Sequence, residues 1–471
     1  MKSNINNFTN DKPREKCGIF GVYGKGFEAA RLVHTGLWAL QHRGQESSGI
    51  ASSDGKQIYC HKKMGLVAHV YDETNLKKLP GFIAIGHNRY STSGESIARH
   101  SQPIVIEKFN LALAHNGNLP NTTEIKKFLT EKKVTFAGLN DSEMMCRMIA
   151  FFLGKGLSLE EAVKKSFPFF TGVFCLLIMT KNKLVAVRDS FGIRPLSIGK
   201  LNGGFVFSSE TCAFDTIGAT YLRDVKPGEM VVVSDQKISS WQLSLGKQKL
   251  DIFEFIYFAR PDSQLLGKSV YEVRKNLGRH LAREYKIKAD VVVPVPDSAI
   301  PAALGFCEVT KIPLDHGLTK NRYIHRTFIR PAKSLREDGV EMKLNAMAGV
   351  LAGKKVIVID DSIVRGTTSR RIVKKIRQAG AKEVHFFVSS PPVKFPDFYG
   401  IDTPSQGDLI GAMKNIEEVR RFIGADSLNY LSYKGMIKAT GLSESLFSTS
   451  CFSGVYPVDI GERAREVSFE I

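Results

Sequence analysis

"VIVIDDSIVRGTTS" (residues 356–369) joins a run of apolar residues to two acids and a loop rich in glycine and hydroxyl side chains. The apolar run, Val356–Ile359, is typical of a parallel strand buried on both faces. Asp360 and Asp361 follow directly, and we expect a helix to begin near Ser369 or Arg370. This order predicts the carboxyl edge of a parallel sheet, where ligands of α/β proteins bind.

The residue types of this loop suit a phosphorylated sugar. Backbone N–H groups at a helix N-terminus, next to glycine and hydroxyls, bind phosphate. Paired carboxylates bind ribose hydroxyls or a magnesium ion, which prefers oxygen ligands. An Asx turn that caps the helix is the simpler interpretation of two adjacent acids, but the combination of acids, loop and helix favours a phosphate site.

The rest of the second half predicts a doubly wound α/β sheet. Continuous apolar runs also occur at residues 289–298 and 382–390, as expected of buried parallel strands. Helical patterns lie at 269–286 and 367–380, so strands and helices alternate.

The first half has a different pattern, which predicts an α+β domain with antiparallel sheets. Its helical patterns lie at 28–44 and 142–156, and a polar stretch near 234–252 indicates the domain boundary. Short apolar runs bounded by Gly, Asn or Ser occur at 18–24, 81–92, 111–119, 172–180, 183–192 and 204–210.

Composition narrows the class of protein. The 471 residues are 43% hydrophobic and 24% charged, which suits two globular domains. No run approaches the ~20 apolar residues of a membrane span, and residues 1–16 lack the apolar core of a secretory signal. Seven cysteines without a CxxC pair favour the reducing cytoplasm. The formal charge of +19 comes without a nucleic-acid motif, so phosphorylated small substrates fit better than nucleic acid.

The 356–369 stretch resembles the phosphoribosyl-pyrophosphate (PRPP) motif of type I phosphoribosyltransferases. The resemblance implies that Asp360 and Asp361 face the ribose diol and a Mg²⁺ ion. The loop that would hold the 5′-phosphate comprises Arg365, Gly366, Thr367, Thr368 and Ser369.

Two further segments match the same family. Asp297 and Ser298, in "VPVPDSAIPAA" (residues 293–303), resemble its diphosphate loop, with Ser298 near the metal. The basic segment 320–345 resembles a flap that closes over the diphosphate through Arg322, Arg326 and Lys343. A solvated loop is the simpler interpretation of most of that segment.

Glycine-turn motifs of the first half resemble class II glutamine amidotransferases, the N-terminal-nucleophile type. They are "LQHRGQESSGIA" (40–51), "GHNRYSTSGES" (86–96), "LALAHNGNL" (111–119), "LNDSEMM" (139–145) and "RDSFGIRPL" (188–196). In that family a cysteine becomes the first residue after processing. The resemblance implies that residues 1–16 are a propeptide and that Cys17 is the nucleophile.

The chemistry of such a site requires this processing. A free α-amino group has a pKa of about 7.7–8.0 and can take the proton of its own thiol at neutral pH. While Lys16 is attached, the same nitrogen is an amide and cannot act as a base. A buried cysteine at a strand start would be the simpler interpretation of Cys17 without the other motifs.

The resemblance also assigns the glutamine pocket. The side chain of Asn116 and the N–H of Gly117 would form the oxyanion hole, and Arg89 would bind the α-carboxylate. Asp141 would bind the α-ammonium, although it could also cap the helix that follows. Arg43 and Thr92 would complete the pocket, and we expect His42, His87 and His115 to be supporting polar core.

From Cys17 onward the chain resembles the amidophosphoribosyltransferase family. The resemblance implies glutamine hydrolysis at Cys17 and passage of ammonia to PRPP, giving 5-phosphoribosylamine, glutamate and diphosphate at the entry to purine synthesis. We expect a propeptide at 1–16, an amidotransferase domain at 17–250 and a phosphoribosyltransferase domain at 251–471. The family also implies inhibition by purine nucleotides and a homodimer or homotetramer.

One feature departs from the family pattern. Members that carry a propeptide often hold a [4Fe–4S] cluster on four cysteines, and the matching positions here are Asp251, Asp397, Ser448 and Cys451. Because the cluster needs four thiolates, we expect none.

Two other functions are possible. A glutamine-dependent synthase of another amine, such as glucosamine phosphate, would lack the 356–369 loop. A non-enzymatic PRPP sensor that binds nucleic acid would suit the positive charge, but the intact cysteine site argues against it.

Overall fold

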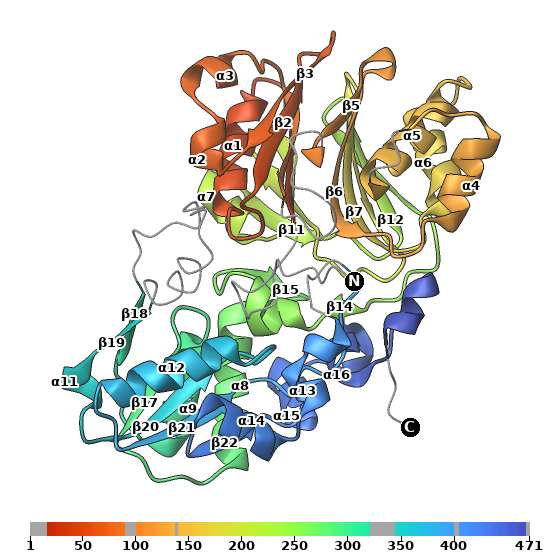
Figure 1. Cartoon of the computed structure of the whole chain (residues 1–471). Helices are drawn as coiled ribbons and strands as arrows, with labels where there is room; N and C mark the ends of the chain where they lie inside the picture. Colours follow the sequence, from red (N-terminus) through yellow and green to blue (C-terminus); the bar gives the residue numbers. More distant parts are fainter. Residues whose placement is uncertain (1–16, 90–99, 137–139, 321–343, 400–404, 468–471) are drawn as a thin grey trace, which may run out of the picture.

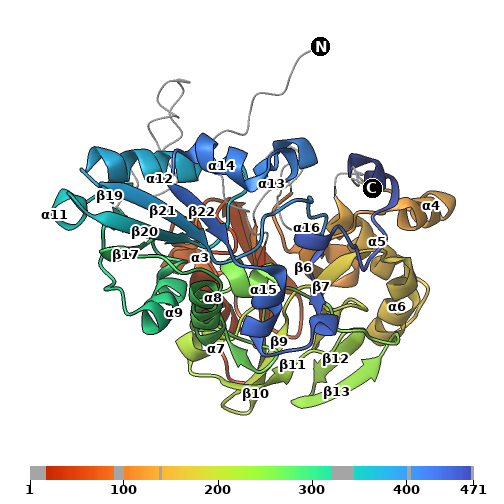
Figure 2. The same cartoon turned by 90° about the horizontal axis from the view of Figure 1, so that it is seen from below.

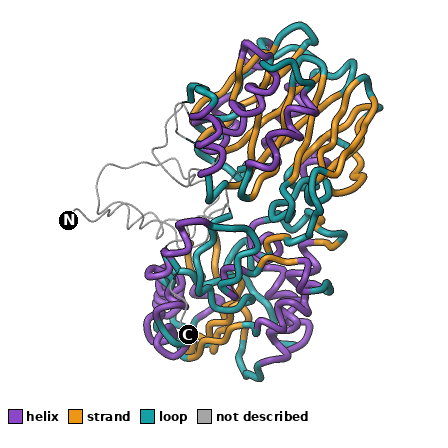
Figure 3. Tube along the Cα trace, turned by 90° about the vertical axis from the view of Figure 1, so that its right-hand side faces the viewer, coloured by secondary structure: helices purple, strands orange, loops and turns teal. Residues whose placement is uncertain are grey.

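The computed structural model describes residues 17–89, 100–136, 140–320, 344–399 and 405–467. The chain forms two lobes, one rich in strands and the other richer in helices (Figures 1 and 3). The predictions for Thr92, Arg322, Arg326 and Lys343, and for residues 1–16, concern residues outside these ranges.

The first lobe contains two antiparallel sheets packed face to face. The first sheet has the order β11 (Thr220–Asp224), β9 (Ser197–Leu201), β10 (Gly204–Ser208), β1 (Gly18–Tyr23), β4 (Ile83–Arg89), β2 (Ser47–Ser53), β3 (Ile58–Met64). The second has the order β13 (Lys237–Gln242), β12 (Glu229–Ser234), β8 (Lys183–Arg188), β7 (Val173–Met179), β6 (Leu111–Asn118), β5 (Ile104–Ile106).

Helices cover the outer faces of both sheets (Figure 1). Over the first sheet lie α1 (Ala29–Ala39), α2 (Val67–Val70), α3 (Glu73–Lys77) and α7 (Cys212–Ile217), and over the second α4 (Thr123–Glu131), α5 (Asp141–Leu153) and α6 (Leu159–Ser166). Strand β1 is buried on both faces: Ile19 and Tyr23 pack between the sheets, whereas Phe20 and Val22 pack against the helices. This confirms the predicted N-terminal-nucleophile fold, with antiparallel sheets between helices.

The second lobe is built on a parallel sheet, as predicted. Its order is β17 (Val291–Pro294), β20 (Lys355–Asp360), β21 (Glu383–Val388), β22 (Ser427–Tyr430). Figure 2 shows α12 (Thr367–Gln378) and α14 (Ile416–Ile423) on one face, and α8 (Val270–Glu284), α9 (Ile300–Thr310) and α15 (Tyr433–Thr440) on the other. Shorter elements are α11 (Ala348–Leu351), α13 (Ile410–Met413), α16 (Ser450–Ser453) and the hairpin β18 (Leu318–Lys320)–β19 (Leu344–Ala346).

The structure corrects the expected boundary region. Lys237–Gln242 is not linker but the edge strand β13, paired with β12 along its whole length. Its side chains are mostly exposed, which is why the polar sequence concealed a strand. The chain then crosses to β14 (Leu250–Asp251), which pairs with β23 (Phe447–Ser448) from near the C-terminus.

The C-terminal segment packs on both lobes. Phe398, Tyr399 and Val458 form a small core with Val173 and Ile193 of the first lobe. The side chain of Asn118, at the end of β6, donates a hydrogen bond to the carbonyl of Phe398 (2.8 Å). The second lobe is therefore in direct contact with the strand that carries Asn116 and Gly117.

Two helix starts differ from expectation. Helix α12 begins at Thr367, not at Ser369 or Arg370, because Gly366 in the left-handed region (φ 78°) forms its N-cap. Helix α5 is capped by Asn140, whose side chain accepts from the N–H of Glu143, so Asp141 is not the cap. Within the described ranges, no helix has the length and apolar character needed to cross a bilayer.

Candidate active sites

Cys17 lies immediately before β1 and is 8% exposed. Ile19 is fixed by Ser209, whose Oγ accepts the N–H of Ile19 (3.0 Å) while its own N–H donates to the Ile19 carbonyl (3.1 Å). The same hydroxyl lies 3.4 Å from Nδ2 of Asn116. Ser209 therefore joins the strand of Cys17 to Asn116.

Ser209 was not among the predicted site residues. It lies in "GFVFSSE" (204–210), where the pattern indicates only a strand and a turn. A separation of 190 residues between Ser209 and Ile19 leaves no local signal for the contact.

Asn116 and Gly117 lie near the end of β6, as expected for an oxyanion hole. Asn116 is fully buried, and within the described ranges its Oδ1 has no hydrogen-bond partner. Buried polar atoms are normally paired, so an amide with one weak contact is suited to bind a ligand. Gly117 has φ 146°, and a Cβ at this position would lie 2.0 Å from the carbonyl oxygen of Val173.

We expect Gly117→Ala to reduce glutamine-dependent activity by about 10²-fold or more, since the displaced turn would misplace an oxyanion donor. Ammonia-dependent activity should persist, because that reaction needs only the second lobe. Steady-state kinetics with each nitrogen source measure the difference. Gly156→Ala is the matched control: its φ is also positive (84°), but nothing lies within 4 Å of the added Cβ. Equal losses in both variants would contradict the assignment.

Arg89 ends β4 at the same edge of the first sheet. It is 9% exposed, and its buried Nη1 has no hydrogen-bond partner among the residues that the structure describes. An unpaired guanidinium nitrogen suits a carboxylate ligand.

Asp141 ties α5 to the end of β6. One carboxylate oxygen accepts the N–H of Leu119 (3.0 Å), and the other accepts the N–H of Ser142 (2.7 Å) and lies 3.7 Å from Nδ1 of His115. Burial raises the pKa of Asp141, but His115 and these hydrogen bonds outweigh it, so the pKa is lowered and the group stays ionised. Asp141 thus has a structural role alongside any contact with an ammonium group.

Arg43 is the predicted pocket residue whose position differs most from expectation. Its side chain is fully buried and paired with Glu210 and Glu254, and its Nε lies 3.4 Å from the Cys17 carbonyl. These contacts connect Arg43 to the residue that would be the nucleophile.

The three histidines lie in polar surroundings, as expected. Nε2 of His87 contacts the carbonyl of His115 (3.0 Å), and Nδ1 of His115 contacts the hydroxyl of Ser142 (3.0 Å). Burial is the main reason why the pKa of His87 falls to about 3, so this ring is neutral. His42 bonds to Glu210 (2.7 Å).

The second site lies at the carboxyl end of β20. Asp360 and Asp361 are each 1% exposed, and the Asp361 N–H donates to Oδ1 of Asp360 (2.9 Å). Asp361 also accepts hydrogen bonds from the hydroxyls of Ser298 and Ser362. The structure therefore brings the two predicted loops to one place, although Ser298 and Asp361 are 63 residues apart in the sequence.

This oxygen cluster is suited to Mg²⁺ only together with a substrate. Among the described residues, no group of three or more His, Cys, Asp or Glu side chains could hold a metal ion. Two carboxylates and a hydroxyl fit the usual pattern in which Mg²⁺ binds one or two carboxylates and takes further oxygens from phosphate and water.

The phosphate loop has the expected form. The N-cap and first turn of α12 comprise Gly366, Thr367, Thr368 and Ser369, and Arg365 directly precedes them. The φ of 78° at Gly366 favours glycine, because side chains rarely adopt this left-handed conformation.

The base of the predicted flap lies next to the diphosphate loop. Strands β18 and β19 pair at its two ends, and Lys320 forms an ion pair with Asp297 (3.0 Å). Lys375 of α12 donates to the carbonyl of Leu344 (2.6 Å), which fixes the other end.

The four positions matched to cluster cysteines gather in one buried region. Asp251 pairs in register with Ser448, Asp397 accepts from the Ser450 hydroxyl (3.3 Å), and the Cys451 carbonyl accepts from the N–H of Lys394 (2.9 Å). Burial first, and then Asp397, raise the pKa of Asp251 to about 8, against the opposing effect of Arg194 (3.5 Å). One thiol among two acids and a serine does not fit a four-thiolate cluster.

We expect the stability of the Asp251→Asn variant, compared with that of the wild type, to increase as the pH rises. The folded-state pKa of Asp251 lies above its unfolded value of about 3.9, so folding retains a proton and the stability of the wild type falls between about pH 4 and pH 8. The variant lacks this loss and should gain on the order of 1–3 kcal/mol relative to wild type between pH 5 and pH 8. Denaturant unfolding at both pH values measures it. Asp315→Asn, at an exposed loop carboxylate, should show no such trend; a pH-independent difference for Asp251→Asn would contradict the prediction.

Family models match both halves of the chain. Residues 87–216 match the family model of a glutamine amidotransferase domain, and residues 264–390 match that of a phosphoribosyl transferase domain. The amidophosphoribosyltransferase of Synechococcus elongatus is 48% identical over 462 residues, 97% of this chain and 94% of the relative. The Bacillus subtilis enzyme is 46% identical over 454 residues, 95% of each.

Solved structures of similar proteins point to the same family as these sequence relatives. The glutamine PRPP amidotransferase of B. subtilis, complexed with ADP and GMP, superposes with a TM-score of 0.88 at 45% identity, covering 95% of this chain and 98% of that one. Another structure, described as the allosteric regulatory enzyme of purine biosynthesis, gives a TM-score of 0.89 at 45% identity, covering 95% and 97%. With sequence identity of 45% or more over nearly the full length of these relatives, this chain belongs to the amidophosphoribosyltransferase family.

Proposed function

We propose that the two half-reactions take place at Cys17 and at the Asp360–Asp361 strand end, with ammonia passing between them inside the protein. The overall reaction is that of the family: glutamine-dependent amination of PRPP, the first step of purine biosynthesis. The observation that carries the assignment of sites is the presence, in one chain, of a buried Cys17 whose strand Ser209 joins to Asn116, together with a buried acid pair at a parallel strand end.

The first half-reaction uses the residues around Cys17. Its thiol, with the proton taken by its own freed amine, attacks the glutamine side-chain amide. Asn116 and the N–H of Gly117 donate to the oxyanion, Arg89 binds the α-carboxylate, and Asp141 binds the α-ammonium. Thr92 completes the pocket. Ammonia leaves, and water then hydrolyses the γ-glutamyl thioester to release glutamate.

The second half-reaction uses the edge of the parallel sheet. Residues 365–369 bind the 5′-phosphate, and Asp360 and Asp361 hold the ribose hydroxyls. These acids and Ser298 would hold Mg²⁺, which would supply positive charge to neutralise the diphosphate. Ammonia forms the new bond to C1 as diphosphate leaves, and Arg322, Arg326 and Lys343 contact the diphosphate from the flap.

We expect the regulation and the assembly of this protein to resemble those of its relatives. The B. subtilis structure was determined with ADP and GMP, which supports inhibition of this enzyme by purine nucleotides. A homodimer or homotetramer located in the cytoplasm suits the family and the cysteine content.

The intact mass of the purified protein under native conditions tests the proposal. We expect the loss of residues 1–16, which exposes the amine of Cys17, and no additional mass of iron and sulfide. Retention of the leader in a fully active enzyme would contradict the role of the freed amine. A bound iron–sulfur mass would contradict the interpretation of Asp251, Asp397 and Ser448.

A further inference from the structure

A buried hydroxyl without a partner lies next to Arg89. Ser47 begins β2, within the 40–51 motif, and pairs in register with Arg89 at the end of β4. It is 2% exposed, and among the residues that the structure describes its Oγ has no hydrogen-bond partner. Because buried hydroxyls are normally paired, the position of Ser47 suggests that its partner is a ligand.

The packing of β2 shows which way Ser47 points. Ile50 packs against the outer helices and Ala51 packs between the two sheets. Even-numbered residues of β2 therefore face the helices, and the Ser48 hydroxyl accordingly donates to Asn88 on that side (2.8 Å). Odd-numbered residues, Ser47 among them, face the gap between the sheets.

Arg89 and Asn116 face the same gap from opposite sheets. Ile85, on the face of β4 that carries Arg89, packs between the sheets, and so does Ala114, on the face of β6 that carries Asn116. In the described part of the chain, each of the side chains of Arg89, Asn116 and Ser47 has a buried polar atom without a hydrogen-bond partner. The gap between the sheets thus holds polar groups from β2, β4 and β6 that a small polar ligand could satisfy.

Cys17, Arg89 and Ser47 follow one another across three neighbouring strands. Gly18 pairs with Asn88, so Cys17 lies at the level of Arg89, which pairs with Ser47 on the strand beyond. Neighbouring strands lie about 4.8 Å apart, so this row spans about 10 Å. Glutamine with its side-chain amide at Cys17 and its α-carboxylate at Arg89 would have Ser47 at its carboxylate end.

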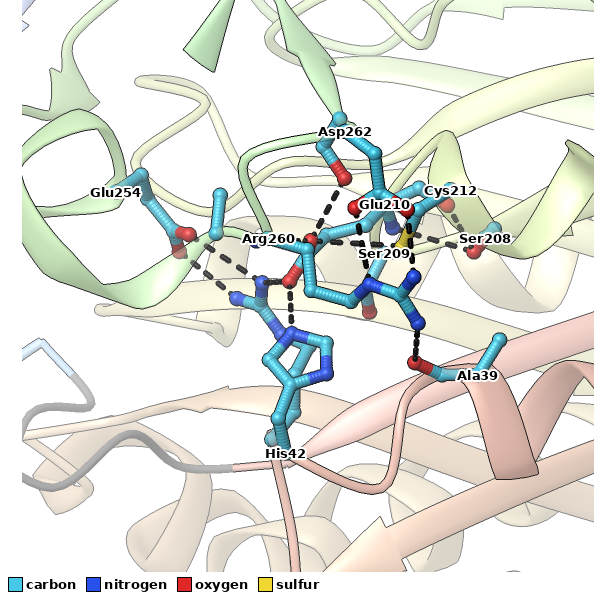
Figure 4. A network of polar contacts seen from close by, with 12 residues as sticks. Ala39, His42, Ser208, Ser209, Glu210, Cys212, Glu254, Arg260 and Asp262 are labelled. Carbon is cyan, nitrogen blue, oxygen red and sulfur yellow. Dashed lines mark hydrogen bonds and ion pairs between the residues drawn. The ribbon is translucent and has the colours of Figure 1, made fainter. Parts of the chain in front are cut away.

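On the other side of Cys17, polar side chains are bonded to groups of the protein (Figure 4). Glu210, just after β10, bonds to His42 (2.7 Å) and accepts the N–H of Arg260 (2.8 Å). The hydroxyl of Ser263 donates to the same carboxylate (2.8 Å). These contacts within the protein favour the β4–β2 side of Cys17 for the substrate.

We propose that Ser47 is a further glutamine-binding residue, whose hydroxyl donates a hydrogen bond to the α-carboxylate beside Arg89. The proposal rests on the assignment of glutamine hydrolysis to Cys17. A carboxylate accepts several hydrogen bonds, and a bond to an ionised acceptor is stronger than one between neutral groups. Ser47 and Arg89 together distinguish glutamine from amides that lack an α-carboxylate.

A contact with the substrate also explains why serine is kept at this position. Burying a hydroxyl without a partner costs free energy, and alanine avoids that cost. Ser47→Ala should therefore melt at the temperature of the wild type or higher, although it binds glutamine more weakly. A hydroxyl with a structural role would lower the melting temperature when it is removed, and that result would count against the proposal.

The test compares Ser47→Ala with the wild type in the full-length enzyme. We expect the KM for glutamine to rise about 10-fold, as for loss of one hydrogen bond to a charged group, with kcat little changed. L-Glutaminamide, in which a neutral amide replaces the α-carboxylate, is the probe and competes with glutamine. Its inhibition constant should change less, so the ratio of this constant to the KM for glutamine should fall about 5-fold. Equal weakening of both ligands would overturn the contact with the carboxylate.

Ser52→Ala is the matched control. Ser52 lies on the same strand, is 0% exposed, and within the described ranges its Oγ also lacks a partner, but it is even-numbered and faces the helices. This variant should keep the wild-type KM and the wild-type preference for glutamine. An unchanged KM in Ser47→Ala, or the same rise in Ser52→Ala, would overturn the role of Ser47. A wild type without glutaminase activity would instead overturn the proposed function itself.

Discussion

Cys17→Ser is expected to reduce glutamine hydrolysis by at least about 10³-fold, because serine replaces a nucleophilic thiol by a hydroxyl that an amine of ordinary basicity hardly activates. The site offers no replacement: the other cysteines of the described first lobe, Cys60, Cys146, Cys175 and Cys212, lie in other elements. Burial is the main cause that raises the pKa of Cys146, Cys175 and Cys212, so these three thiols are poor nucleophiles at neutral pH.

Release of glutamate and formation of diphosphate, measured separately, check this prediction. With ammonium salts in place of glutamine, Cys17→Ser should form diphosphate at a rate close to that of the wild type, since its second lobe is unchanged. Cys60→Ser, at an exposed thiol, is the matched control and should keep both activities. Normal glutamine consumption by Cys17→Ser would remove the basis for the whole assignment of the first site.

The sequence was sufficient where one local feature determines the structure. Continuous apolar runs predicted β17, β20 and β21, and glycine-bounded runs predicted β1, β4, β6, β7, β8 and β10. The polar edge strand β13 was missed, because an exposed edge strand carries no apolar alternation. The start of α12 was placed two residues late, since the φ of Gly366 sets the cap and cannot be read from residue type.

The candidate site was predictable as a set of motifs but not as a network. Asn116, Gly117 and Arg89 lie at strand ends of the two sheets, which is where their motifs place them. Arg43 was predicted as a pocket residue, but its ion-pair partners Glu210 and Glu254 were not predicted. They are 167 and 211 residues away in the sequence and belong to no recognised motif. Contacts of this kind depend on how the lobes pack, which a single sequence does not reveal.

Asp361→Asn is expected to reduce PRPP amination by about 10²-fold or more with either glutamine or ammonia. The carboxylate is 1% exposed and accepts from Ser298 and Ser362, so it is already oriented at the edge where the ribose and the metal would bind. An amide keeps the shape but loses the charge and one acceptor oxygen, and with them the attraction for Mg²⁺.

This change differs from Cys17→Ser in a way that kinetics can resolve. Glutamine hydrolysis without PRPP should persist in Asp361→Asn, whereas ammonia no longer rescues amination. Asp290→Asn is a suitable control, because Asp290 is an exposed carboxylate just before β17, at the amino end of the same sheet, and binds the N–H of Lys355 (2.7 Å). Normal amination of PRPP by Asp361→Asn would show that the reaction requires the shape of this side chain, which asparagine keeps, and not its charge. The charge of Asp361 would then have no part in binding the sugar or the metal.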